Sequence, residues 1–133
     1  MASTTLEQGI GVKLRATVAV TAYTSTRIYW LSAPDNATLP YIVYRVVSQE
    51  NEGDEGGDAK DSTALVQFDI WSKDQYDALG ISGALISTLE AYSGGFDGIN
   101  VTRVTTNGPQ QLRDPDFPTM FHFIIDADMT FYR

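Results

Sequence analysis

Side chains able to do chemistry gather near the carboxyl end of the chain. His122, Asp126 and Asp128 are separated by even numbers of residues, so an extended strand would place them on one face, with Asp69 on a neighbouring strand. Imidazole and carboxylate groups bind divalent metals and move protons, which makes a metal-dependent hydrolase or a small-ligand site one hypothesis. However, residues four apart on a strand lie about 13 Å apart, so one ion cannot join His122 to Asp126. We therefore interpret this set as the solvated face of a sheet.

Other catalytic patterns are missing from the sequence. It contains one histidine and no cysteine, so it has no thiolate metal site, cysteine nucleophile or disulfide framework. A glycine-rich phosphate loop, a nucleophile elbow and a helix with paired histidines are also absent. We predict a protein that is not an enzyme, with no catalytic residue, bound metal or cofactor.

Acidic residues dominate the charge of the chain, whose formal net charge is -8. Within residues 50–61 one lysine stands among six acids, which are Glu50, Glu52, Asp54, Glu55, Asp58 and Asp61. Glycines interrupt the same segment, so we expect a mobile acidic loop there. The chain lacks the basic stripe that neutralises phosphates, which argues against tight nucleic-acid binding.

The length of 133 residues suits a single domain spanning residues 1–133. No stretch approaches the roughly 20 apolar residues needed to cross a bilayer, and the first residues lack the basic and apolar regions of a signal peptide. We expect a soluble, unexported protein that does not contact membranes.

Apolar spacing predicts two helices. Residues 5–19 carry an apolar residue at every fourth position, and Thr4 and Glu7 have the form of a capping box at their start. A second helix is expected to begin at Ser72, with Gln75 completing a capping box, and to end before two glycines at residues 94 and 95. The expected buried stripes consist of Leu6, Ile10, Leu14 and Val18 in the first helix and Ala78, Ile81, Leu85, Leu89 and Tyr92 in the second.

Alternating apolar residues predict five strands, at residues 27–30, 41–49, 64–71, 99–106 and 121–132. The segment 107–109, Asn-Gly-Pro, is expected to end the fourth strand. Both faces of residues 41–49 are largely apolar, which suggests cover on both sides, one of them from another subunit. The predicted fold is α+β, a two-layer sandwich of an antiparallel or mixed sheet with two helices on one face.

Three short strand motifs resemble one family. They are RIY at residues 27–29, LPYIVY at residues 39–44 and VQFDIW at residues 66–71. Their order and spacing, in a small chain with an amphipathic helix before them and an amphipathic strand at the end, resemble the tail completion or tail terminator proteins of long-tailed bacteriophages.

The resemblance implies a structural virion protein at the head-tail junction, made in the host cytoplasm. Such proteins form a ring, expected to be a hexamer, that caps the head-proximal end of the tail tube and stops its polymerisation. The implied partners are other copies of the chain, the major tail tube protein and a head-tail connector or stopper, with DNA only passing through. A head-side connector or stopper of the phage neck remains the alternative.

Three sets of residues are candidates within that interpretation. The six acids of residues 50–61 would order against a neighbouring subunit or the tube. Asp69, Asp126 and Asp128 would face the channel, where negative charge keeps DNA from adhering. A third set, expected to form ion pairs between subunits, consists of Arg27, Arg45 and Arg103.

Overall fold

The computed structural model describes residues 5–51, 62–90, 92–96, 98–112 and 120–132. These residues form three helices, which are α1 (Leu6–Arg15), α2 (Val18–Thr24) and α3 (Gln75–Leu89). They also form six strands, which are β1 (Ile28–Trp30), β2 (Tyr41–Asn51), β3 (Ser62–Ser72), β4 (Gly94–Phe96), β5 (Ile99–Leu112) and β6 (Phe121–Tyr132).

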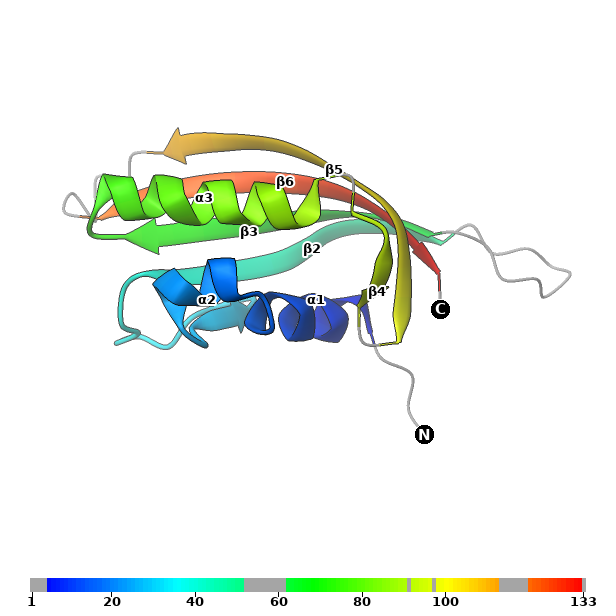
Figure 1. Ribbon diagram of the computed structural model, residues 1–133, viewed down its shortest axis with the longest axis horizontal. Coiled ribbons are helices and arrows are strands. Elements are labelled where there is room, and N and C mark those ends of the chain that lie inside the picture. Colours follow the sequence, from blue (N-terminus) through cyan, green and yellow to red (C-terminus); the bar gives the residue numbers. More distant parts are fainter. Residues whose placement is uncertain (1–4, 52–61, 91, 97, 113–119, 133) are drawn as a thin grey trace, which may run out of the picture.

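The six strands form one mixed sheet in the order β1-β2-β3-β6-β5-β4 (Figure 1). β1 pairs with β2 in parallel, and every other neighbouring pair is antiparallel. The three strand motifs RIY, LPYIVY and VQFDIW therefore lie side by side in β1, β2 and β3. The predicted α+β class and mixed sheet are confirmed.

The sheet curls around the helices instead of forming a flat layer below them. Figure 1 shows the helices on one side of the bent sheet. Helix α1 contacts both β1 and β4, which are the two edge strands of the sheet. One short helix can reach both edges only if the sheet bends toward it. The described residues therefore form a half-barrel whose inner face holds three helices, instead of the expected two-layer sandwich with two helices on one face.

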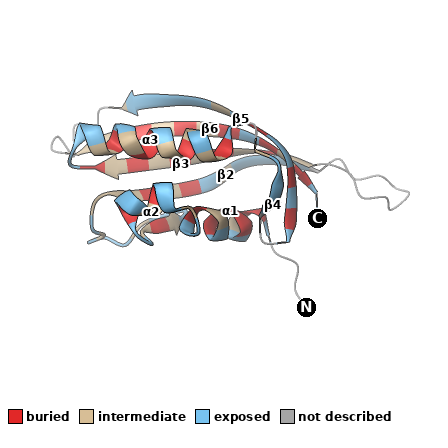
Figure 2. Ribbon diagram, viewed as in Figure 1, coloured by how far each residue is buried: buried red, intermediate tan, exposed pale blue. Residues whose placement is uncertain are grey.

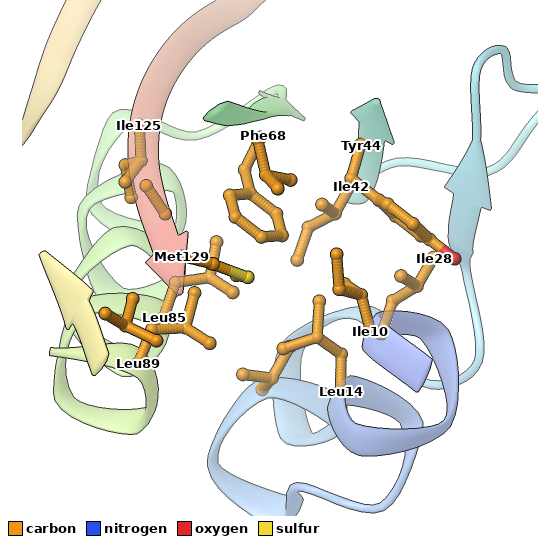
Figure 3. Packing of buried hydrophobic residues seen from close by; sticks show 14 of the residues in the cluster. Ile10, Leu14, Ile28, Ile42, Tyr44, Phe68, Leu85, Leu89, Ile125 and Met129 are labelled. Carbon is orange, nitrogen blue, oxygen red and sulfur yellow. The ribbon is translucent and has the colours of Figure 1, made fainter. Parts of the chain in front are cut away.

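The hydrophobic core fills the space between the curled sheet and the helices. Phe68 and Ile70 of β3 point inward, as do Ile125 and Met129 of β6, and all four are fully buried. They meet Leu85 of α3 and the α1 side chains shown in Figure 3. Buried residues alternate with partly buried ones along β3 and along most of β6 (Figure 2), which confirms the predicted inner faces of these strands.

Helix α1 begins one residue later than expected. Thr5, not Thr4, is the N-cap, and it exchanges hydrogen bonds with Gln8 at 3.2 Å and 3.0 Å, so Gln8 replaces Glu7 in the capping box. Gly11 allows close packing, because a Cβ there would lie 2.7 Å from the Tyr44 hydroxyl. That hydroxyl donates a 2.8 Å hydrogen bond to the carbonyl of Glu7 and ties α1 to β2.

The expected helix over residues 5–19 is two helices. Thr17 takes an extended conformation (φ -95°, ψ 106°), and its hydroxyl donates to the carbonyl of Lys13 at 2.7 Å, which ends the first helical run. The chain then turns into α2, so Val18 leaves the apolar stripe of α1. Val18 is 78% exposed, and its predicted burial was wrong.

Helix α3 also differs from the prediction at both ends. Ser72 is the last residue of β3, and Asp74 is the N-cap, accepting a 2.8 Å hydrogen bond from the backbone of Tyr76. The helix ends at Leu89, so Tyr92 lies beyond it and is partly buried, with the ammonium of Lys13 4.6 Å from its ring centre. The two glycines expected to stop the helix belong to β4 instead.

Three strands, β2, β3 and β5, are longer than the alternation predicted. β5 continues through Asn107, Gly108 and Pro109, which form an irregularity in its pairing with β6 instead of ending the strand. Gly108 has φ 121°, and a Cβ there would lie 2.8 Å from the carbonyl oxygen of Ile124, so glycine is required. β2 extends to Asn51, which places Glu50 in a strand instead of a loop.

Candidate functional site

The outer face of the sheet, directed away from the helices, carries the three acids that were predicted to face the channel. Alternation places Asp69 of β3 and Asp126 and Asp128 of β6 on this face. In the antiparallel register Asp126 lies opposite Gln67, and Asp128 lies opposite Leu65. The structure therefore brings the three predicted channel-facing acids onto one surface of two adjacent strands.

Asp69 is held by its neighbours on this face. The Gln67 amide donates a 2.7 Å hydrogen bond to Asp69 Oδ1, and His122 Nε2 lies 3.4 Å from Asp69 Oδ2. Burial alone raises the pKa of the Asp69 carboxyl, but the Gln67 amide and the His122 imidazole outweigh it, so the pKa lies below its ordinary value. The Arg45 charge acts in the same direction. Asp69 is therefore an ionised group with fixed partners.

An aromatic cluster lies beside Asp69, which sequence reasoning did not find. The rings of Trp71 and His122 stack with centres 3.8 Å apart, and the rings of Tyr29 and Tyr41 meet edge to face at 5.9 Å. Tyr41, Trp71 and His122 are opposite one another in the register of β2, β3 and β6. The alternation had placed Trp71 with Asp69, but the order of the strands was needed to bring His122 beside them.

A cavity of about 300 Å³ adjoins this cluster. Its lining comes from the loop between β1 and β2 and from the ends of the strands, namely Ala33, Pro34, Asp35, Ala37, Leu39, Tyr41, Trp71 and Met120. The cavity is mainly apolar and lacks a converging set of charged groups.

The predicted metal or acid-base set does not converge. Within the described parts of the chain, no three histidine or acidic side chains lie close enough to hold a metal ion. The His122 ring is stacked on Trp71, and its Nε2 has no aligned hydrogen-bond partner. This geometry gives the hypothesis of a metal-dependent hydrolase no support.

The three arginines proposed for contacts between subunits are in different environments. Arg27 is partly buried and donates a 3.1 Å hydrogen bond from Nε to the carbonyl of Pro40, so it anchors the loop before β2. Arg45 and Arg103 are exposed on the sheet. Only these two have guanidinium groups open to a neighbouring molecule.

The acidic segment joins two strands that pair with each other. Glu50 lies at the exposed end of β2, opposite Thr63 of β3. The other five acids of the set, Glu52, Asp54, Glu55, Asp58 and Asp61, lie outside the described residues.

Comparison with solved structures shows the same fold in a phage-like particle. A chain of the structure described as "Virion of native gene transfer agent (GTA) particle" matches with a TM-score of 0.72 at 11% identity, covering 91% of this chain and 90% of that one. A second solved chain matches with a TM-score of 0.54 at 13% identity, covering 89% and 86%. At these identities the likeness concerns the fold.

The sequence itself matches the family model described as "Tail completion protein gp17" over residues 8–131. No curated protein sequence matches significantly. The match defines the class of molecule, a structural protein of a phage tail located in the virion. The chain belongs to the tail completion protein gp17 family.

Among the described residues, no helix is long and apolar enough to cross a membrane.

Proposed function

We propose that this protein forms a ring that caps the head-proximal end of the phage tail tube, stops tube polymerisation and offers the surface to which the head joins. The observation that carries the proposal is the family match over residues 8–131, which spans nearly the whole chain. The fold shared with a chain of a phage-like virion agrees with it. The expected ring is a hexamer, in contact with the major tail tube protein on one side and a connector or stopper on the other.

The alternative is a head-side connector or stopper, and tail length separates the two functions. We would delete the reading frame from its parent phage and measure tail lengths and head attachment by negative-stain electron microscopy. Overlong tails beside unattached, filled heads are the expected result, and the wild-type gene supplied in trans should restore normal tails. Tails of normal length that fail to join heads would assign the protein to the connector side. Intact infectious particles would overturn both functions.

Within the ring, the outer face of the sheet would line the channel. The acids Asp126 and Asp128 would repel passing DNA and keep it from adhering. The Asp128→Lys variant should therefore assemble normally and slow DNA ejection, measured as the rate of DNA release from purified particles. Asp35→Lys makes the same charge change on an exposed loop and serves as the control. Equal ejection rates for the two variants would remove the channel assignment.

The acidic segment would order against a neighbouring subunit or the tube. Deleting residues 52–59 removes most of its charge and leaves β2 and β3 intact. We expect defects in termination or head joining, read by the same microscopy. Normal tails joined to heads would show that the segment is not an assembly element.

Arg45 and Arg103 would pair with acids across subunits, because both are exposed, whereas Arg27 already bonds within its own chain. Exposed pairs of this kind contribute only about 0 to 1 kcal/mol each. Single Arg45→Gln or Arg103→Gln variants should therefore weaken tail incorporation only slightly and make it less sensitive to salt.

A further inference from the structure

Large apolar side chains are exposed on two helices that contact each other. On α3, Tyr76 is 81% exposed and Leu79 is 45% exposed, and on α2, Val18 and Tyr23 are exposed as well. Tyr23 lies against α3, since a Cβ at Gly80 would be 2.4 Å from its hydroxyl. We call Val18, Tyr23, Tyr76, Leu79 and Gly83 the helical patch.

Gly83 has no explanation inside the subunit. It is exposed within α3, and a Cβ built there meets no atom within 4 Å. Glycine in a helix interior is unfavourable relative to alanine, and here no intramolecular contact requires it. Residues 76, 79 and 83 follow the spacing of one helix face. A glycine on such a face permits the close approach of another chain.

A second exposed apolar site lies at the β1 edge of the sheet. Trp30 and Leu31 are 53% and 56% exposed. Trp30 borders a hollow of about 400 Å³, which we call the edge pocket and which is lined by Thr5, Glu7, Gln8, Arg15, Trp30 and Tyr44. The helical patch and the edge pocket share no residue and belong to different elements.

The edge of β1 is not available for strand addition. The carbonyl of Ile28 accepts a 2.9 Å hydrogen bond from Arg15, and the amide of Ile28 donates to Thr26 at 2.8 Å. The carbonyl of Trp30 accepts from Ser32 at 2.8 Å. These backbone groups are bonded within the subunit, so a partner at this edge contacts side chains instead of extending the sheet.

The net charge of the chain determines where two copies in the proposed ring approach each other with the least repulsion. Copies with a net charge of -8 repel each other wherever their acidic faces meet. The helical patch carries no charged residue, and the edge pocket carries one acid and one base, Glu7 and Arg15, so both sites are neutral. Two copies therefore approach at these sites with the least repulsion.

We infer that the helical patch of one subunit packs onto the edge pocket of the next, with close approach at Gly83. Two different patches meeting head to tail are what a closed ring of identical subunits requires. The inference rests on the proposed ring and names the surfaces that form it.

The absence of native cysteine allows a direct test by crosslinking. A chain carrying both Tyr76→Cys and Trp30→Cys is expressed in infected cells, tails are purified, and a short bifunctional thiol crosslinker is added. We expect a ladder of multimers on denaturing gels that stops at the ring number. Each single-cysteine variant should remain monomeric. The control chain, with Tyr132→Cys and Trp30→Cys, should give no ladder.

Other outcomes separate the inference from the proposed function. Double-cysteine chains that are present in tails but remain monomeric would overturn the inference and leave the function standing. Dimers from Tyr76→Cys alone would show two helical patches facing each other, which also overturns it. If the chain is absent from tails, the proposed function fails, and the same reaction on concentrated purified protein decides the inference, with a ladder supporting it and monomers overturning it.

A Gly83→Ala variant provides a second readout. The isolated chain should unfold at a higher temperature than the wild type, because the added methyl meets open space. Its incorporation into tails, in competition with the wild type, should fall roughly tenfold, since the methyl overpacks the contact. Undiminished incorporation would overturn close approach at Gly83. A Val12→Ala substitution on the exposed side of α1 is the matched helical control and should leave incorporation unchanged.

Discussion

Two glycines on one face of α3 should respond oppositely to the same substitution. Gly80 and Gly83 are three residues apart, and replacing either by alanine removes a helix penalty of about 1 kcal/mol. At Gly83 the new methyl group has no neighbour within 4 Å, so Gly83→Ala should stabilise the isolated chain by nearly that amount. For a domain of this size, the midpoint of thermal unfolding should rise by roughly 3 to 5 °C.

At Gly80 the same methyl group would lie 2.4 Å from the hydroxyl and 2.7 Å from Cζ of Tyr23. The ring must move by about 1 Å, and overpacking of this kind costs about 1 to 3 kcal/mol. After the helix gain of about 1 kcal/mol is subtracted, Gly80→Ala should lose between about 0 and 2 kcal/mol. Its unfolding midpoint should therefore not rise.

The Tyr23→Ala background makes the comparison decisive, because it removes the ring that the new methyl group meets. Gly80→Ala should then become stabilising by about 1 kcal/mol, as at Gly83. Urea denaturation of the four chains in the cycle measures the coupling. Equal stabilisation at both glycines in the wild-type background would refute the packing of α2 on α3 through Tyr23.

Three further predictions concern the cap, the core and the outer face. Thr5→Ala removes the α1 capping box and should cost about 1 kcal/mol, measured by urea denaturation. Phe68→Ala, at a fully buried position of β3, should cost about 3 to 5 kcal/mol and lower the unfolding midpoint strongly. Asp69 has a lower pKa in the folded chain than its ordinary value, so its contribution to stability is present above about pH 4 and is lost as the pH falls through the folded pKa. Asp69→Asn should therefore be less stable than the wild type at pH 7. The difference in the free energy of unfolding between the two chains should shrink in a series of denaturation curves taken down to pH 2. A difference that does not depend on pH would contradict this account.

The sequence predicted the strand faces well because a buried strand imposes a period of two on its residues. The inward sets of β3 and β6 followed from alternation alone, as did the outward positions of Asp69, Asp126 and Asp128. Alternation does not depend on which strand lies next to which. The predicted inward and outward faces were therefore correct even though the order of the strands was unknown.

Helix boundaries were less predictable, because adjacent residues compete for the same role. Thr4 and Thr5 are both suitable caps, and Ser72 and Asp74 offered the same choice at α3, where the polar residue nearer the helix is the cap. The four-residue repeat ran on to Val18 without showing that the chain turns at Thr17. In each case a local side-chain hydrogen bond of Thr5, Asp74 or Thr17 marks the observed helix end.

The edge pocket and the stacking of His122 on Trp71 join segments far apart in the chain. Neither has a signal within any single window of sequence, since each depends on how the sheet curls and on the order of its strands. The role of Arg15, which donates a hydrogen bond to the carbonyl of Ile28 at the β1 edge, was also not predictable from the sequence, because it depends on where α1 lies.

The contact of α1 with both β1 and β4 also bears on how the protein is made. Helix α1 is synthesised early, and β4 is synthesised about 80 residues later, which corresponds to roughly 4 to 16 s of translation. During that time the apolar side of α1, with Leu6, Ile10 and Leu14, has no β4 to cover it. The contact between α1 and β4 can therefore form only after most of the polypeptide has been synthesised, so the native fold is completed late.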